Sequence, residues 1–136
     1  MKVILTFILN HCLFLFENYG FRFVDSLYSD SFGGDAYVTL ESEYIKMRFV
    51  YDRAQLTLEF ASRKKQKASW CWYSIDLISQ FITGKIESSS LLDVRYARFL
   101  LENMGKIVDA FSDENIDRTL DELDKFARAR AKRLFG

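Results

Sequence analysis

Apolar and polar side chains alternate through three short runs between residues 37 and 61, and this alternation strongly constrains the fold. Successive side chains of a β-strand point to opposite faces of a sheet, so each run has one apolar and one polar face. Polar breaks at 41–43 and 52–55 separate the runs. The pattern predicts a three-stranded antiparallel meander with one buried and one solvated face. The side chains expected on the buried face are Val38, Leu40, Ile45, Met47, Phe49, Tyr51, Leu56, Leu58 and Phe60.

The break at 52–55 predicts a tight hairpin turn centred on Arg53 and Ala54. Tight hairpin turns favour positive φ angles, which suit glycine or asparagine better than alanine. The sequence therefore indicates either another turn type or backbone strain at Ala54.

Residues 2–19 are the most apolar stretch of the chain and predict a buried helix that ends at Gly20. Polar residues at 10–12 interrupt the stretch, which is shorter than the roughly 18 apolar residues of a membrane span. No small-residue cleavage site follows, so we expect neither a secretion signal nor a membrane helix. Residues 21–28 are the expected first strand, which brings the sheet to about four strands. The expected buried stripe of the helix is Leu5, Leu9, Cys12, Phe16 and Tyr19.

Helical periodicity dominates the C-terminal half. Ser74 is the expected N-cap of a first helix, which ends at Gly84. A second helix is expected to begin near Ser90 and Asp93, which approximate a capping box. Ser112 is the expected cap of a third helix. We expect a single α+β domain over residues 1–136, with these helices packed on one face of the antiparallel sheet. The expected stripes of the last two helices are Val94, Ala97, Leu101, Met104, Val108 and Phe111, and Ile116, Leu120, Leu123, Ala127 and Leu134.

Charge and composition exclude several classes of function. Lys plus Arg and Asp plus Glu both number 19, and this balance argues against a dedicated nucleic-acid or membrane-surface protein. His11 is the only histidine, Cys12 and Cys71 are the only cysteines, and their spacing matches neither a zinc site nor a nucleophile–base pair. We therefore expect a cytoplasmic protein with reduced thiols, no metal, no cofactor and no catalytic activity.

Two groups of carboxylates are candidate partner-binding surfaces. Asp25, Asp30 and Asp35 lie in or near a glycine-containing loop at 29–35, where exposed charge would steer a basic partner. The second group is interleaved with cations and is expected to be a solvated helix face. Its members are Asp113, Asp117, Asp121 and Asp124.

A basic segment at 63–67, followed by aromatic residues at 70–73, supports an alternative function, the binding of nucleic acid. Cations beside stacking rings are typical of single-stranded nucleic-acid binding. Trp70 and Trp72 lie two residues apart, however, which equally describes core aromatics on one face of a short strand at 70–73. Packing beneath the helices is the favoured interpretation. The candidate nucleic-acid contacts are Arg63, Lys64, Lys65, Lys67, Trp70 and Trp72.

The order of a helix, a four-stranded meander and three helices resembles small bacterial immunity-type proteins of polymorphic toxin systems. The resemblance rests on the helix ending in Asn18, Tyr19, Gly20 and Phe21, on the strand and turn at 48–55, and on Trp72 and Tyr73 before a helix. Similar chains carry glycine where Ala54 stands. The resemblance implies a non-enzymatic cytoplasmic protein that binds one cognate toxin domain. The alternatives are the nucleic-acid-associated regulator and a structural homodimer joined through its sheet edge or its helix hairpin.

Overall fold

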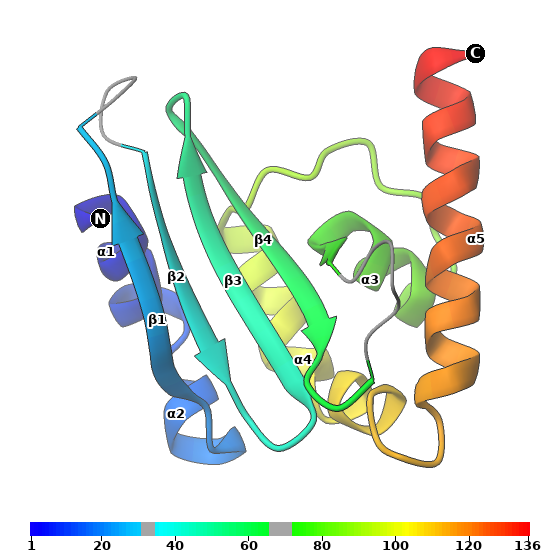
Figure 1. Cartoon of the computed structure of the whole chain (residues 1–136), viewed down its shortest axis with the longest axis horizontal. Helices are drawn as coiled ribbons and strands as arrows, with labels where there is room; N and C mark the ends of the chain where they lie inside the picture. The colour runs from blue at the N-terminus through cyan, green and yellow to red at the C-terminus, as the bar shows by residue number, and fades with distance from the viewer. Residues whose placement is uncertain (31–34, 66–71) are drawn as a thin grey trace.

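A five-stranded antiparallel sheet forms the centre of the computed structural model, which describes residues 1–30, 35–65 and 72–136 (Figure 1). Its strands lie in sequence order, and the sheet has one short strand beyond the expected four, because β5 pairs with Glu59 and Phe60 of β4. The strands are β1 (Arg22–Tyr28), β2 (Ala36–Glu41), β3 (Ile45–Asp52), β4 (Gln55–Ser62) and β5 (Tyr73–Ser74).

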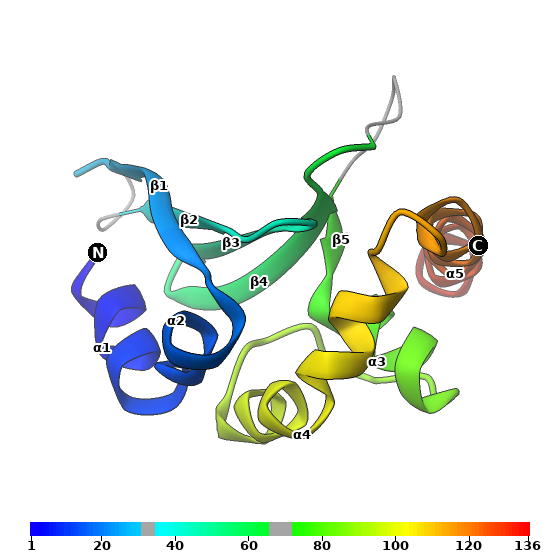
Figure 2. The ribbon, with the colours of Figure 1, turned by 90° about the horizontal axis from the view of Figure 1, so that it is seen from below.

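The described residues also form five helices, and sheet and helices together confirm the predicted α+β class. Helices α1, α2 and α4 lie under one face of the sheet, α3 lies under β4 and β5, and α5 stands beside α3 (Figure 2). Among the described elements, no helix covers the opposite face of the sheet (Figure 2). The helices are α1 (Lys2–His11), α2 (Phe14–Tyr19), α3 (Ile75–Thr83), α4 (Val94–Ala110) and α5 (Ile116–Phe135).

The strand register places the alternating apolar residues as predicted. Phe49 pairs with Val38 on one side and with Leu58 on the other, and all three side chains are at most 2% exposed. The next row, formed by Leu40, Met47 and Phe60, is completely buried. These rows build the core layer between the sheet and the helices. Tyr51 and Leu56, at the end of the β3–β4 hairpin, are only half-buried.

The N-terminal segment differs from the prediction of one helix over 2–19. The helix breaks after His11, and a second, shorter helix runs to Gly20, whose φ of 70° ends it as predicted. Ile4 and Ile8 face the core, whereas Leu5 and Leu9 are exposed by 38% and 62%. The segment is apolar on nearly every side, so periodicity alone could not select the buried stripe.

The starts of the two C-terminal helices also differ from the predictions. Asp93 is itself the N-cap of α4, because its carboxylate accepts a hydrogen bond from the Tyr96 amide at 3.0 Å. Helix α5 has Asn115 at its N-cap, and Ser112 contributes its backbone carbonyl to the preceding turn. The predicted stripes are wrong at three positions. Val94, Leu101 and Leu134 are each more than half exposed.

Of the two alternatives that the sequence left open for the β3–β4 turn, another turn type or backbone strain, the structure has the strained backbone. Arg53 has a φ of 52° and Ala54 a φ of 63°, the positive values of a two-residue hairpin turn. At positive φ, the Cβ atom of an L-residue lies too close to the backbone, which raises the energy of the turn, whereas glycine has no Cβ and avoids this strain.

Replacing Ala54 with glycine should therefore stabilise the protein. We expect Ala54→Gly to raise the free energy of unfolding by about 0.5–1 kcal/mol, measured by urea denaturation. Ala61→Gly is the matched control, since Ala61 lies within β4 and is only 2% exposed, and it should destabilise. A loss of stability in Ala54→Gly would contradict the assignment of strain to this turn.

Removing the Phe49 side chain from the core should lower the stability of the protein. We expect Phe49→Ala to lower the free energy of unfolding by about 3–5 kcal/mol, because the side chain is completely buried. Val50→Ala, on the uncovered face of the same strand, is the control and should cost much less. A change below about 1 kcal/mol for Phe49→Ala would show that the two faces of the sheet are wrongly assigned.

Candidate functional site

The uncovered face of the sheet carries a stacked cluster centred on Arg48. Its guanidinium carbon lies 4.1 Å from the centroid of the Trp72 ring and 5.5 Å from that of Tyr37, and its Nε lies 3.4 Å from a Glu59 carboxylate oxygen. Guanidinium–ring contacts of this kind are attractive and fix both partners. We call this surface the open face. Its residues on the three central strands are Tyr37, Thr39, Arg48, Val50, Thr57 and Glu59.

The acidic residues predicted as a partner surface lie at one margin of the open face. The Tyr37 hydroxyl donates to Asp25 at 3.2 Å, and the Arg53 amide donates to Asp35 at 3.3 Å across the neighbouring hairpin. Asp30 is exposed, and its hydrogen bond with Tyr28 is the main cause that raises the pKa of that phenol. The fold therefore brings Asp25 beside the open face and places Asp30 and Asp35 near its end, while residues 31–34 lie outside the described part.

The predicted nucleic-acid contacts are engaged in protein contacts wherever the structure describes them. Arg63 lies 3.1 Å from Glu41, Lys64 lies 3.7 Å from Asp113, and Lys65 lies 3.1 Å from Asp117. Trp72 is half-buried beneath Arg48, and Lys67 and Trp70 lie outside the described residues.

The carboxylate stripe predicted on the last helix is likewise not a free surface. Asp113 and Asp117, which lie before and at the start of α5, pair with the two lysines of the basic segment. Farther along, Asp124 accepts a hydrogen bond from the Tyr73 hydroxyl at 2.5 Å. This stripe attaches the last helix to the strand region and explains the acidic spacing without a ligand.

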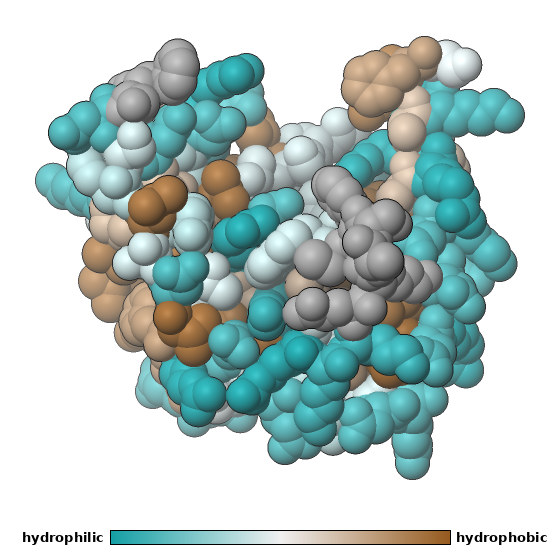
Figure 3. All heavy atoms as spheres, viewed as in Figure 1, coloured by the Kyte–Doolittle hydropathy of each residue, from teal (hydrophilic) through white to brown (hydrophobic). Residues whose placement is uncertain are grey.

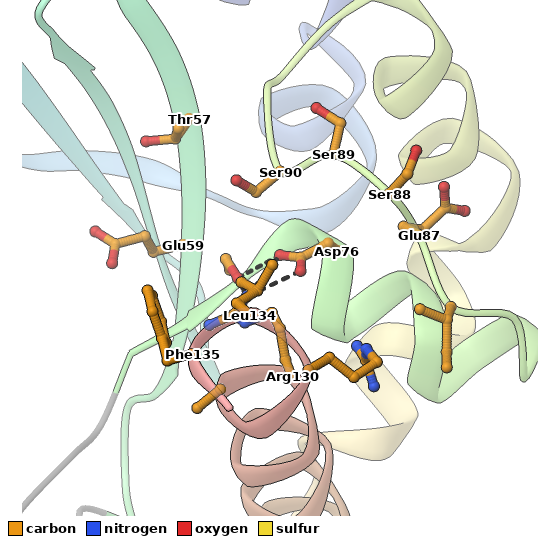
Figure 4. Close-up of a pocket in the computed structure, with 14 residues that line it drawn as sticks. Thr57, Glu59, Asp76, Glu87, Ser88, Ser89, Ser90, Arg130, Leu134 and Phe135 are labelled. Atoms are coloured by element: carbon orange, nitrogen blue, oxygen red, sulfur yellow. Dashed lines mark hydrogen bonds and ion pairs between the residues drawn. The ribbon is translucent and has the colours of Figure 1, made fainter.

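A cleft that the sequence did not predict adjoins the open face. It has a volume of about 570 Å³ and is enclosed by β4, the start of α3, the 86–90 loop and the end of α5 (Figure 4). Thr57 and Glu59 belong to both the cleft and the open face, so the two surfaces are continuous. Leu134 and Phe135, exposed by 66% and 86%, form an apolar rim on the helix side.

An ion pair between the buried Asp76 and the half-buried Arg130 forms the floor of this cleft. The Arg130 guanidinium donates from Nη1 to Asp76 at 2.9 and 3.1 Å and to the Ser74 hydroxyl at 2.6 Å. The Ser74 hydroxyl in turn donates to Asp76, which is only 6% exposed. The cluster joins the last helix to the start of α3. Ser74 was predicted as a helix N-cap, but Arg130 lies 54 positions from Asp76, and no spacing rule connects them.

The remaining titratable groups do not build a metal or thiol site in the described chain. Burial raises the pKa of the Cys12 thiol to about 12, and the His11 ring packs at a tilt against Phe7, with 4.9 Å between the ring centroids. Within residues 1–30, 35–65 and 72–136, no three His, Cys, Asp or Glu side chains gather as metal ligands. In that same part of the chain, no helix is long and apolar enough to cross a membrane.

Comparison with known proteins does not assign the chain to a family. No family model, curated protein or solved structure matches it. The open face and the cleft are therefore interpreted from their own chemistry.

Breaking the Arg130–Asp76 ion pair should destabilise the fold. We expect Arg130→Met to lower the free energy of unfolding by about 1–3 kcal/mol, because Asp76 then stays buried without its cation. Arg133→Met is the matched control, since Arg133 lines the same cleft but is exposed. Urea denaturation of both variants tests this, and equal small changes would show that the ion pair contributes little.

Proposed function

We propose that this chain is a protein-binding module that uses the open face and its cleft, and that it acts as an immunity-type inhibitor of a bacterial toxin domain in the cytoplasm. The observation that carries the proposal is the Tyr37–Arg48–Trp72 stack on a sheet face that no described helix covers. Tyr, Arg and Trp are the residue types most enriched among the energetically dominant contacts of protein interfaces. Their mutual packing holds them in place before a partner arrives, which reduces the entropy lost on binding.

The shape of the surface supports a protein partner. The cleft beside Glu59 is hollow, and its rim at Leu134 and Phe135 exposes large apolar side chains. A flat polar face that ends in a hollow with an apolar rim suits a projecting loop of another protein. Inhibition would then follow from occlusion of the partner's active site and would require no chemistry from this chain.

The acidic margin supports a basic partner surface. Asp25, Asp30 and Asp35 lie along one hairpin, next to the open face. The net charge of the chain is zero, so only a local group of this kind can steer a charged partner. A toxin domain with a cationic catalytic cleft is the partner that this arrangement fits.

Existing contacts weaken the nucleic-acid alternative. Three cations of the basic segment are already 3.1–3.7 Å from carboxylates. Stacking of a base on the Trp72 ring would compete with the guanidinium of Arg48, which lies 4.1 Å from its centroid. The three cations and the Trp72 ring would have to leave their protein partners before they could bind a nucleic-acid strand.

The decisive experiment uses a toxin domain encoded next to the gene for this chain. Co-expression of the chain should restore growth, and the purified proteins should bind. We expect Trp72→Ala to weaken binding by about 30-fold, measured by calorimetry, because it removes a ring at the centre of the proposed interface. Arg98→Ala, an exposed position on α4, is the control and should bind normally.

Two results would overturn the proposal. One is the absence of binding and growth rescue with the neighbouring toxin domain. The other is a Trp72→Ala variant that binds as tightly as the unchanged chain. Quenching of tryptophan fluorescence by an oligonucleotide, lost steeply as salt rises, would instead support the nucleic-acid alternative.

A further inference from the structure

We infer that Lys46 and Arg48 form a receptor for one carboxylate of the protein partner, and that this contact fixes the orientation of the partner on the open face. The inference rests on the proposed function and names the chemistry of the partner at one point of that surface. Both residues lie on β3, two positions apart, so their side chains leave the same face of the sheet about 7 Å apart. Figure 3 is viewed from the side of the open face, and it shows mostly hydrophilic side chains over the lower part of the molecule, where β3 begins (Figure 1).

The guanidinium of Arg48 lacks hydrogen-bond acceptors. Its Nε is buried without a hydrogen-bond partner, because the Glu59 oxygen 3.4 Å away lies outside hydrogen-bond geometry. None of its other N–H groups donates to a described residue. Polar groups this close to a protein interior are nearly always satisfied, so the site favours an acceptor supplied by a ligand. The side chain as a whole is 29% exposed, which leaves its terminal nitrogens within reach of that ligand.

The rings beside Arg48 restrict how a ligand can approach. Tyr37 lies on β2 and Trp72 precedes β5, so the two rings flank the guanidinium from opposite sides of β3. The edge that carries the terminal nitrogens is the part left for a ligand. A carboxylate is planar and matches this edge with two parallel hydrogen bonds, a geometry that is both strong and specific.

Lys46 adds a second cation to the same site. The strand register places Glu41 opposite Lys46, but the Glu41 carboxylate lies 3.1 Å from Arg63. The Lys46 ammonium forms no ion pair within the described part of the chain. Two neighbouring cations, one without hydrogen bonds and the other without an ion pair, attract an anion to the space between them.

The surroundings of the two cations favour a single carboxylate over a nucleic-acid strand. Asp25, Glu41 and Glu59 lie on the same face of the sheet, on the strands that flank β3 or one strand beyond. A nucleic-acid strand carries a phosphate at every nucleotide, and some of these phosphates would lie against the three carboxylates, which is unfavourable. One acidic side chain of a folded partner can reach the two cations alone.

This contact would select the partner and its orientation. The acidic margin at Asp25, Asp30 and Asp35 favours cations on the partner, whereas Lys46 and Arg48 favour a carboxylate. A partner must therefore present both charges at the matching separation. A rotated partner, or an unrelated basic protein, would place like charges opposite each other and lose affinity.

Calorimetry with the toxin domain encoded next to the gene for this chain tests the inference. We expect Lys46→Glu to raise the dissociation constant by about tenfold or more, because it places a carboxylate against the carboxylate of the partner. Arg48→Lys should raise it by about tenfold, since it keeps the charge but loses the paired hydrogen bonds. Lys106→Glu and Arg98→Lys, matched changes at exposed positions of α4, are the controls and should bind normally.

Labelling of carboxyl groups identifies the partner's side of the contact. Carbodiimide-driven coupling of glycine ethyl ester to the toxin domain should modify an Asp or Glu that the bound chain protects, and Arg48→Lys should protect it less at saturation. Replacing that carboxylate with lysine should weaken binding to the unchanged chain. The same replacement should restore binding to Lys46→Glu, because the two charges are then exchanged and remain complementary.

The outcomes separate this inference from the proposed function. A toxin domain that binds Lys46→Glu or Arg48→Lys as tightly as the unchanged chain, or that has no protected carboxylate, would overturn the inference alone. The absence of any binding would overturn the proposed function and the inference with it. Oligothymidine that competes with the toxin domain, and whose binding Lys46→Glu abolishes, would assign the site to phosphate instead. If urea denaturation shows that Arg48→Lys fails to fold, Lys46→Glu decides.

Discussion

The one-sided apolarity of the sheet is the constraint on which the rest of the structure depends. Met47 and Phe49 are completely buried, whereas Arg48 between them points to the opposite face, where it stacks on Trp72. The apolar face must be covered by helices, and the polar face can remain open. The same period of two that builds the core thus also creates the surface proposed to bind a partner.

The last helix, α5, stands beside α3 and forms one wall of the cleft that adjoins the open face. It packs on the core through Ile116, Leu120 and Leu123, which are buried. Polar contacts add to this packing: the Arg130–Asp76 pair, 2.9 Å long, and the hydrogen bond from Tyr73 to Asp124. A shift of this helix would leave the carboxylate of Asp76, which is only 6% exposed, without its cation. The position of one wall of the cleft therefore depends on the Arg130–Asp76 contact.

Local sequence rules predicted most of the fold and little of the site. Alternation located Phe49 and Leu58 in the core, and Gly20 ended its helix, because both depend on near neighbours. The buried stripe of the first helix was missed, since Leu5 and Ile8 are equally apolar and only the fold distinguishes them. The cleft was missed for a different reason. It depends on Arg130, whose partner is set by tertiary structure, and on the end of α5 lying near β4, two segments that are far apart in the sequence.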